Sequence, residues 1–597
     1  MENKYQAAVK LQDLLISNSH AFHEALQLQK MKTCQELIND ITAALSALAH
    51  VVENQDIQPC FDSFHAMLHN ITWTVDKIID QINDNQDEKA LDLIEFQLIP
   101  FMTEWREDTY FWFLIYPDRE KMNIYYETEF ARNHKNNYEN RGEKYLVSIF
   151  IPVYNKLEYT KKCLDSLYRY TDFEKYQCEL ILLNDGSTDE TDIYFESLGI
   201  RKVLTLKENV KTMIFSLMYR VCQGKYAVFV NNDTILTSHW LDNLLACIKS
   251  DETIISVVPS TPNTSNLQSM TVRLTPENVQ EEAKNHNKTN PLLWEERSRL
   301  MPVIALYDIN KVNTIGFADR YFYTMEFWDD DFSFRARRAG YKQILCRDTW
   351  CYHFGSVSGG EDQVKHRTLE NGRELFLRKH GVDAWGEGFC YDPYLGGHLE
   401  STMVYQPAEG KILGIDTGFG GDVRHIKNML KRHEKYAEIS LLLSDSSFEN
   451  DFGPCKKSVF VSPSIFKIHN YVPQENFNYI YIGKDLSVYP CYEDLLTSCV
   501  NHLRENGILA FYIRNPYSIT IKNEILEEKL LNDKDLITLI NMNKVITFLQ
   551  RMDLQLQLGA LGTTEPPHVL RRDYTEHIER YLILCTKKTA INEDSHG

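Results

Sequence analysis

The first 130 residues carry apolar side chains at intervals of three and four positions. The pattern is clearest over residues 37–52, 71–82 and 91–98, and the last run ends at Pro100. Such spacing places the apolar residues on one face of an α-helix, and glycine is absent from the whole segment. The sequence therefore predicts an all-α region, a helical bundle or array, over residues 1–130.

Two shorter features follow within and after this segment. The aromatic residues between Trp105 and Phe113 suit either a helix core or a docking surface, and we favour the core because large apolar residues are most often buried. Residues 131–144 are polar, and this composition predicts a linker to the next domain.

From Tyr145 the pattern changes to short apolar strands that alternate with helical segments. Residues 146–155 (LVSIFIPVYN), 178–191 (CELILLNDGSTDET) and 226–235 (YAVFVNNDTI) each begin as an apolar run and end in polar residues. This order predicts a doubly wound α/β sheet. The three polar strand ends are therefore expected to line one crevice, where such sheets bind nucleotides and other ligands.

The third strand end carries the residues best suited to chemistry. Asp233 follows Asn231 and Asn232, and a carboxylate with amide neighbours can hold a divalent cation and, through it, a diphosphate. The alternative is a helix cap, because Asp and Asn also favour the position before a helix, and residues 234–239 can begin one. These residues alone leave both interpretations open.

An acidic run, Asp329, Asp330 and Asp331, precedes the string RARRAGY further along the chain. A carboxylate there can accept the proton of an attacking hydroxyl. Alternatively, the acids complement the positive end of a helix dipole. Three adjacent acids also repel one another, which is expected to raise the pKa of at least one of them.

The strings IPVYN, LLNDGSTD and FVNNDT, in this order and spacing, resemble the family 2 glycosyltransferases of the GT-A fold. The resemblance implies a nucleotide-sugar donor across the three strand ends, with Asp185 on the pyrimidine base and Asp233 as the main ligand of Mn²⁺ or Mg²⁺. The donor-binding residues that it implies are Pro152, Tyr154, Asn155, Asp185, Gly186, Ser187, Asn231 and Asn232. Because Asn231 is a weaker ligand than a carboxylate, Asp233 is expected to be the least replaceable residue of its motif.

Residues 303–345 resemble the acceptor half of the same family. Aligned on RARRAGY, Trp328 replaces the usual Glu, and Asp329 takes the position of the catalytic base. The resemblance implies that Asp330 and Asp331 belong to the acidic helix start near the acceptor.

His353 ends a strand just before the Gly/Ser-rich string GSVSGG. In the resembling family a histidine here is often a metal or diphosphate contact, and the loop closes over the donor. The resemblance implies that role for His353, whereas a lone histidine is more often not a ligand. Lys365, His366 and Arg367 follow, and each taken singly is expected to be solvated surface.

A second α/β pattern follows over residues 408–590. The order of its elements resembles that of class I methyltransferases. Residues 410–432 read as strand, glycine-rich turn and helix, and residues 477–516 as strand, helix, turn and strand. Residues 581–588 would be the last strand of that fold, which is antiparallel to its neighbours. The resemblance implies a Rossmann-like sheet.

The glycine motif of those methyltransferases is degraded in this chain. Gly414 replaces the usual acid and Asp416 the first glycine of G-x-G-x-G. A side chain at a position where cofactor approaches the backbone is expected to clash. We predict a scaffold that does not bind S-adenosylmethionine and has no methylation activity. Its expected use is acceptor docking or oligomer contact. If S-adenosylmethionine does bind, Asp445 is the candidate partner of its ribose.

Length, charge and cysteine usage limit the class of protein. The chain has 597 residues, a formal net charge of −20 and 13 cysteines without a CxxC pair. The length predicts several domains, which we place at 1–130, 145–395 and 408–590. The charge argues against nucleic acid or an anionic membrane as the main partner. No signal peptide and no apolar run of about 20 residues is present, so we expect a soluble cytoplasmic protein without a membrane span.

The resemblance implies an inverting, metal-dependent enzyme that moves one sugar from a nucleotide-sugar donor. The expected donor is UDP-N-acetylglucosamine, and the expected acceptor is a protein hydroxyl, such as Ser or Thr of flagellin or another surface protein. The alternatives are a surface-polysaccharide glycosyltransferase that uses a UDP- or dTDP-sugar, an enzyme that also methylates with S-adenosylmethionine, and a non-catalytic binding protein. The QxxRW string of processive synthases is missing, which favours transfer of a single sugar.

Overall fold

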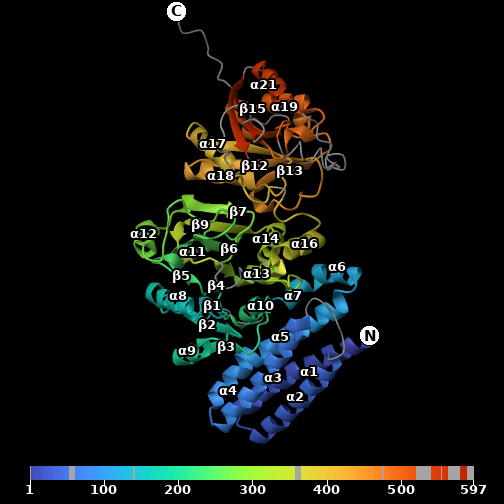
Figure 1. Cartoon of the computed structure of the whole chain (residues 1–597), viewed down its shortest axis with the longest axis vertical. Coiled ribbons are helices and arrows are strands. Elements are labelled where there is room, and N and C mark those ends of the chain that lie inside the picture. The colour runs from blue at the N-terminus through green and yellow to red at the C-terminus, as the bar shows by residue number, and fades with distance from the viewer. Residues whose placement is uncertain are drawn as a thin grey trace, which may run out of the picture. The chain divides into compact units, whose positions relative to one another are not determined.

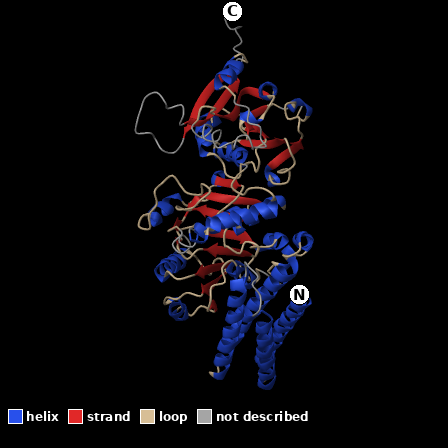
Figure 2. Cartoon of the chain, turned by 45° about the vertical axis from the view of Figure 1, so that its right-hand side comes forward, coloured by secondary structure: helices blue, strands red, loops and turns tan. Residues whose placement is uncertain are grey.

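The structure is a computed structural model of the chain (Figures 1 and 2). It describes residues 2–52, 61–136, 138, 142–355, 363, 365–386, 388–472, 476–518, 540–552, 554–562 and 578–587. The chain divides into two compact units. The first consists of Met1–Pro291, Leu300–Ala339 and Gln343–Gly381, and the second of Leu292–Arg299, Gly340–Lys342 and Val382–Gly597. The predicted all-α region and the predicted GT-A sheet both lie in the first unit.

The N-terminal region is helical, as the spacing of its apolar residues predicts (Figure 1). Its elements are α1 (Glu2–Gln27), α2 (Met31–Val52), α3 (Phe61–Asn83), α4 (Asp87–Leu93), the π-helical turn η1 (Ile94–Leu98), α5 (Ile99–Tyr110), the π-helical turn η2 (Phe111–Ile115), α6 (Arg119–Thr128) and α7 (Phe130–Asn133). Trp105, Phe111 and Trp112 are buried, so this aromatic stretch belongs largely to the core.

Pro100 does not end a helix, contrary to the sequence prediction. It is the second residue of α5, and the π-helical turn η1 comes directly before that helix. Proline lacks the N–H of a helical hydrogen bond, and a π-helical turn is one of the irregularities by which a continuous helix accommodates such a gap. The helical path therefore continues from α4 through η1 into α5.

The predicted linker 131–144 is anchored at one of its polar residues. Asn136 is buried, and its side-chain nitrogen donates to the carbonyls of Tyr219 and Cys222, both at 2.6 Å. Its backbone N–H donates to the side chain of Asn313 at 2.8 Å. Within this predicted linker, the polar side chain of Asn136 therefore serves packed backbone groups and not solvent.

The first unit contains a mixed α/β sheet with the expected alternation of strands and helices. The elements are β1 (Val147–Val153), α8 (Leu157–Tyr170), β2 (Cys178–Asp185), α9 (Thr191–Ser197), β3 (Lys202–Leu206), α10 (Met213–Val221), β4 (Tyr226–Val230), β5 (Thr234–Ile235), α11 (Trp240–Ile248), β6 (Ile254–Ser260), α12 (Val279–His286), β8 (Ile304–Asp308), α13 (Ile309–Ile315), α14 (Trp328–Arg338), β9 (Lys342–Trp350), β10 (Tyr352–His353) and α16 (Thr368–His380). Within this unit the strands of the main sheet follow the order β3-β2-β1-β4-β8-β6-β9.

The register of the parallel strands brings the predicted strand ends to one edge of the sheet. Val153 of β1 pairs with Asn184 of β2, and Phe150 pairs with Phe229 of β4. All residues of β4 are buried, as expected of a central strand. The carboxyl ends of β1, β2 and β4 therefore meet where a doubly wound sheet binds ligands.

The second unit contains the methyltransferase-like sheet. The unit includes β7 (Trp294–Arg297), which is not a strand of this sheet. Its other elements are α17 (Pro393–Met403), β11 (Glu409–Ile415), α18 (Gly421–Arg432), β12 (Tyr436–Leu443), β13 (Lys456–Val461), β14 (Phe477–Ile482), α19 (Tyr492–Asn501), β15 (Leu503–Arg514), α21 (Met542–Gln550), β16 (Leu554–Gly562) and β17 (Ile578–Lys587). The sheet order is β13-β12-β11-β14-β15-β17-β16, and β17 is antiparallel to both neighbours. This topology confirms the predicted Rossmann-like, methyltransferase-type fold.

The helical region holds the first sheet through buried ion pairs. Arg320 lies 3.2 Å from Glu104 of α5 and also contacts Asp108 of the same helix. Arg220 of α10 contacts Glu104 as well, and all four side chains are largely buried. A buried carboxylate is tolerated only with such partners, so these contacts fix where α5 packs.

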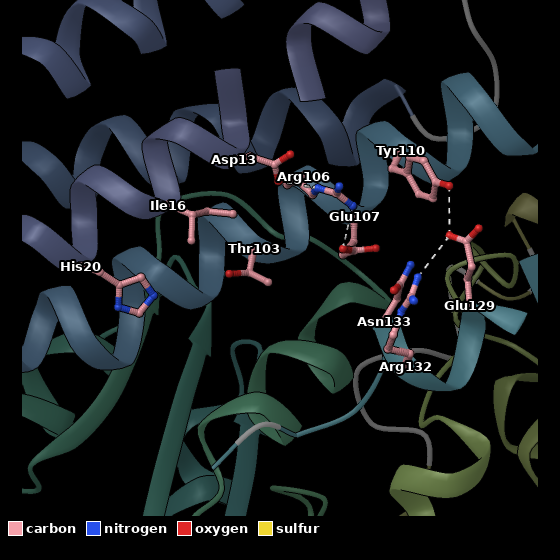
Figure 3. Close-up of a pocket in the computed structure, with 10 residues that line it drawn as sticks. All are labelled: Asp13, Ile16, His20, Thr103, Arg106, Glu107, Tyr110, Glu129, Arg132 and Asn133. Carbon is pink, nitrogen blue, oxygen red and sulfur yellow. Dashed lines mark hydrogen bonds and ion pairs between the residues drawn. The ribbon is translucent and has the colours of Figure 1, made fainter. Parts of the chain in front are cut away.

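A second group of charged residues surrounds a cavity of about 640 Å³ among α1, α5 and the α6–α7 segment (Figure 3). Arg106 donates to Asp13 at 2.9 Å and to Glu107 at 3.0 Å. Across the cavity the hydroxyl of Tyr110 donates to Glu129 at 2.9 Å. These contacts join the first helix to the helices that follow α5 in sequence.

We expect Arg320→Ala to lower the free energy of unfolding by about 3–5 kcal/mol, because it leaves Asp108 buried without its cation and removes one of the two arginines at the buried Glu104. Arg378→Ala is the matched control, since that arginine pairs with Glu374 at 2.6 Å while both side chains are about 60% exposed, and it should cost less than about 1 kcal/mol. Urea unfolding followed by circular dichroism measures both. Equal losses would contradict the role given to the buried pairs.

Candidate functional site

The turns after β1 and β2 support each other through hydrogen bonds. The backbone N–H of Asn155 donates to Oγ of Ser187 at 2.8 Å, and Oδ1 of Asn155 accepts from the N–H of Thr188 at 2.8 Å. Asn155 adopts a left-handed conformation with φ of 56°. This strained position is held by the partner loop, and such positions are common at functional sites.

The neighbouring predicted residues lie at the same edge of the sheet. Pro152 is half-buried near the end of β1, and Tyr154 after it is 41% exposed. Gly186 has a φ of 74°, and a Cβ atom there would lie 2.9 Å from the backbone nitrogen of Asn209. Only glycine fits this turn, so the loop containing Asn209 packs directly against the end of β2.

Asp185 is the last residue of β2 and is 2% exposed. Its Oδ1 accepts a hydrogen bond from the backbone N–H of Val210 at 3.0 Å. Burial raises the pKa of Asp185 well above its ordinary value, and the Val210 hydrogen bond opposes this shift only in part. A further N–H donor at this carboxyl group would favour its charged form.

The residues after β4 do not begin a helix. Thr234 and Ile235 form the short strand β5, and α11 begins only at Trp240. The alternative of a helix cap at residues 231–233 is therefore wrong. The backbone N–H of Asn231 donates to the carbonyl of Val303 at 2.9 Å.

The other two residues of this strand end point to different neighbours. The side chain of Asn232 donates to Oγ1 of Thr160 on α8 at 3.0 Å. Asp233 is 7% exposed, and its carbonyl accepts from the N–H of Phe354 at 3.0 Å. The chain that follows β9 therefore lies directly beside Asp233.

Asp233 and His353 are brought together by the antiparallel pair β5 and β10, in which His353 pairs with Thr234. Nε2 of His353 lies 3.4 Å from Oδ2 of Asp233. Nδ1 of His353 lies 3.2 Å from the carbonyl oxygen of Asn263, which can only accept a hydrogen bond. Nδ1 therefore carries the hydrogen, and in the neutral imidazole Nε2 is a bare lone pair facing a carboxylate. Nε2 of His353 and the carboxylate of Asp233 thus face each other, as two ligands of one cation would.

Sequence reasoning missed Asn263. Besides its carbonyl contact with His353, its side-chain nitrogen donates to the carbonyls of His353 at 2.9 Å and Phe354 at 3.2 Å. It thus orients the histidine, as second-sphere groups do for metal-binding imidazoles. The turn composition TPNTSN was the signal for a loop here, but nothing in it indicated this partner.

The acidic run forms the first turn of α14, after a strained approach. Met325 and Phe327 have φ values of 69° and 68°. Asp329 is partly exposed, whereas Asp330 and Asp331 are buried. Of the three acids, Asp329 is therefore the one exposed enough to contact a ligand.

Asp331 is held by three basic side chains. Its carboxylate lies 2.8 Å from Arg335, 2.6 Å from Lys379 and 2.7 Å from His380. Burial alone would raise the pKa of Asp331, but the charges of Lys379 and Arg335 and the contact with His380 outweigh it and lower the pKa well below its ordinary value. At this acid, repulsion among neighbouring carboxylates is overruled by the surrounding cations.

Glu326 is a second residue that sequence reasoning missed. Its Oε1 accepts from the side chain of Gln363 at 2.8 Å and from Thr368 at 3.3 Å. Burial raises the pKa of Glu326, and the charge of Asp329 raises it further. The two carboxylates are therefore electrostatic neighbours, and the acid three positions before Asp329 was visible in the sequence.

The segment after β10 is described only in part. Residues 356–362, most of the predicted GSVSGG loop, lie outside the described residues. Lys365, His366 and Arg367 are exposed, as expected. Among the residues that the structure describes, no cluster of three or more His, Cys, Asp and Glu side chains is placed to hold a metal ion. Asp233 and His353 are a pair of such side chains that the strand ends bring together.

In the second unit, side chains of the protein fill the glycine-rich turn after β11. Asp416, with φ of 47°, accepts from the backbone N–H of Ser444 at 2.6 Å and from the hydroxyl of Tyr489 at 2.9 Å. A Cβ atom at Gly420 would lie 1.7 Å from the ring of Phe452. Asp445 is about half-exposed and accepts from the N–H of Ser447 at 2.8 Å. The Asp416 carboxylate is thus engaged by the turns after β12 and β14.

The comparison with protein families agrees with this geometry for part of the chain. Residues 148–311 match the model of Glycosyl transferase family 2. This family 2 segment contains the three strand ends and Asp233, while Asp329 and His353 follow it. A curated relative, an uncharacterized glycosyltransferase of Rickettsia prowazekii, is 34% identical over 91 residues. The match covers 15% of this chain, which spans 28% of the length of that relative.

Solved structures with similar parts belong to two groups. Staphylococcus aureus TarS 1–349 is 18% identical, with a TM-score of 0.27, covering 39% of this chain and 65% of that chain. The mannosyltransferase PcManGT of Pyrobaculum calidifontis, in complex with GDP-Man and Mn²⁺, is 14% identical, with a TM-score of 0.30 and coverages of 43% and 71%. A SAM-dependent methyltransferase of Archaeoglobus fulgidus is 12% identical, with a TM-score of 0.25 and coverages of 36% and 99%. Within the described part of the chain, no helix is long and apolar enough to cross a membrane.

We expect no binding of S-adenosylmethionine by the wild-type protein in isothermal titration calorimetry, because the carboxylate of Asp416 occupies the turn that would approach the cofactor. The variant Asp416→Gly removes that carboxylate and serves as the matched test of this cause. A wild-type Kd on the order of 1 μM would contradict the prediction.

Proposed function

We propose that the protein is a metal-dependent, inverting glycosyltransferase that moves one sugar from a nucleotide-diphosphate sugar to an acceptor hydroxyl. The observation that carries the proposal is the pair Asp233 and His353, which lies at the strand-end crevice of a segment that matches family 2. Polar strand ends, a carboxylate facing an imidazole lone pair and a partly exposed acid at α14 are the parts such a transfer requires.

The donor would lie across the ends of β1, β2 and β4. The pyrimidine base is assigned to Asp185, whose buried carboxylate can accept from the ring N–H that uracil and thymine share. Tyr154, Asn155, Gly186 and Ser187 would form the wall beside the nucleoside, and Asn231 and Asn232 would face the sugar and diphosphate. UDP-N-acetylglucosamine is the proposed donor.

The residues at the metal corner fit Mn²⁺ or Mg²⁺. Asp233 offers a carboxylate oxygen, and His353 offers Nε2 because its Nδ1 hydrogen is directed to the carbonyl of Asn263. When bound, the cation would offset the charge that develops on the leaving diphosphate. Asp233 and His353 would hold it in place beside the diphosphate.

Asp329 is the proposed general base. It would accept the proton of the acceptor hydroxyl as the oxygen attacks the anomeric carbon opposite the departing diphosphate, which inverts that centre. Asp331 would fix the first turn of α14 through its ion pairs, and Glu326 would keep a negative charge near Asp329. Both residues are positioning residues in this account.

A protein hydroxyl, on Ser or Thr of flagellin or another surface protein, is the proposed acceptor, and nucleic acid is not. The second candidate is a surface-polysaccharide glycosyltransferase with a UDP- or dTDP-sugar donor, because the Asp185 contact does not separate the two bases.

The cysteines that the structure describes are free thiols, which supports a reducing compartment such as the cytoplasm.

Hydrolysis of nucleotide-sugars in the absence of acceptor, with and without Mn²⁺, tests the donor site. We expect wild-type protein to hydrolyse UDP-N-acetylglucosamine slowly with Mn²⁺, and Asp233→Ala to lose about 100-fold or more in rate. Asn231→Ala is the matched control at the same strand end and should lose less, since an amide is the weaker ligand. Hydrolysis that needs neither Mn²⁺ nor Asp233 would overturn the metal assignment.

Replacement of the proposed base separates binding from chemistry. We expect Asp329→Asn to lower the transfer rate about 10²–10⁴-fold while the Kd for UDP with Mn²⁺ stays within about twofold. Glu326→Gln should cost less, because Glu326 acts through the charge it places near Asp329. A larger loss for Glu326→Gln than for Asp329→Asn would assign the base to Glu326 instead. Intact mass spectrometry of a co-expressed acceptor protein measures the transfer.

A further inference from the structure

The loop after β3, residues 207–212, is held from outside the sheet by the N-terminal helices. β3 is an edge strand, and its free side is covered by η1. Oε1 of Gln97 in η1 accepts from the backbone N–H of Thr205 at 3.0 Å. Gln97 is buried, and it donates to Oγ1 of Thr74 on α3 at 2.7 Å. A helical side chain thus satisfies a strand N–H that would otherwise lack a ladder partner.

Asn70 of α3 makes the closest connection to this loop. Its Oδ1 accepts from the backbone N–H groups of Lys207 at 2.7 Å and Glu208 at 3.0 Å. Its Nδ2 donates to the carbonyl of Glu208 at 2.9 Å. Asn70 is fully buried, with 0% exposure. The Asn70 amide thus accepts two hydrogen bonds and donates a third. Because all three go to the loop backbone, the path of the loop depends on Asn70.

The other side of the same loop reaches both halves of the proposed site. The N–H of Val210 donates to Asp185, and Asn209 packs against Gly186. Oγ1 of Thr212 donates to the carbonyl of Phe322 at 2.8 Å and accepts from the N–H of Met325 at 3.1 Å. The loop therefore lies between the helices on one side and, on the other, the base-binding carboxylate and the turn before α14.

We propose that the N-terminal helices are part of the donor site, and that Asn70 is a positioning residue for nucleotide binding. Asn70 fixes the loop, and the loop fixes the Val210 N–H that shares the Asp185 carboxylate with the nucleotide base. The inference rests on the proposed glycosyltransferase function, because it assumes that Asp185 binds the base. It assigns to an otherwise unexplained helical region an effect on donor affinity that acts through the loop 207–212.

The test is calorimetric binding of UDP with Mn²⁺ to the full chain, together with donor hydrolysis kinetics. We expect Asn70→Ala to raise the Kd for UDP and the KM for the donor about 10–100-fold, with kcat changed less than KM, because displacement of a positioning loop acts first on ligand placement. His69→Ala is the matched control. His69 contacts the same loop through Glu208 at 2.8 Å, but its side chain is 61% exposed, so little change is expected.

The outcomes are separable. If wild-type protein binds UDP with Mn²⁺ and folded Asn70→Ala binds it equally well, the inference is overturned while the proposed function stands. If wild-type protein binds no nucleotide, the proposed function fails and the inference fails with it. Should Asn70→Ala not fold, Asn70→Asp carries the test, because it keeps the shape and both accepted hydrogen bonds. It replaces the donation to the Glu208 carbonyl by a carboxylate oxygen that repels that carbonyl, so a rise in the same Kd is expected, whereas an unchanged Kd would count against the proposal.

Discussion

The parallel pairing of β1 with β2 and β4 is the constraint on which the proposed chemistry depends. It forces three chain turns to occur at one edge of the sheet, and each turn carries polar groups that the apolar strands cannot bury. The short pairing of β5 with β10 then adds His353 to Asp233 from a distant part of the sequence. The Asp233 carboxylate and the His353 imidazole are thereby held next to each other by paired strands.

Buried charge has a different role in the same unit. Arg320 joins α5 to the segment between α13 and α14, and Asp331 joins α14 to α16, in each case with partners that offset the cost of burial. Packing therefore separates acids that the sequence presents as equivalent. Asp331 is used inside the protein, whereas Asp329, two positions earlier, keeps enough exposure to meet a ligand.

The strands, most helices and the common edge were predictable because they follow from local periodicity and from the rules of parallel sheets. What local spacing did not predict was the setting of single residues. Pro100 continues a helical path after a π-helical turn, and Asn136 bonds with the backbone near Tyr219, far away in sequence. Asn263 and Glu326 were missed for the same reason, since their partners are set by tertiary pairing that no spacing reveals.

The two sheets of this chain also differ in how the polar groups at their strand ends are hydrogen-bonded. Both place a turn at the carboxyl ends of parallel strands, where ligands bind in such folds. In the second unit both carboxylate oxygens of Asp416 accept hydrogen bonds from the protein itself, through Ser444 and Tyr489. In the first unit Asn231 and Asn232 remain partly exposed beside an imidazole that directs its lone pair at Asp233. In the proposed function, unspent bonding capacity, and not topology, is therefore what favours the first sheet as the ligand site.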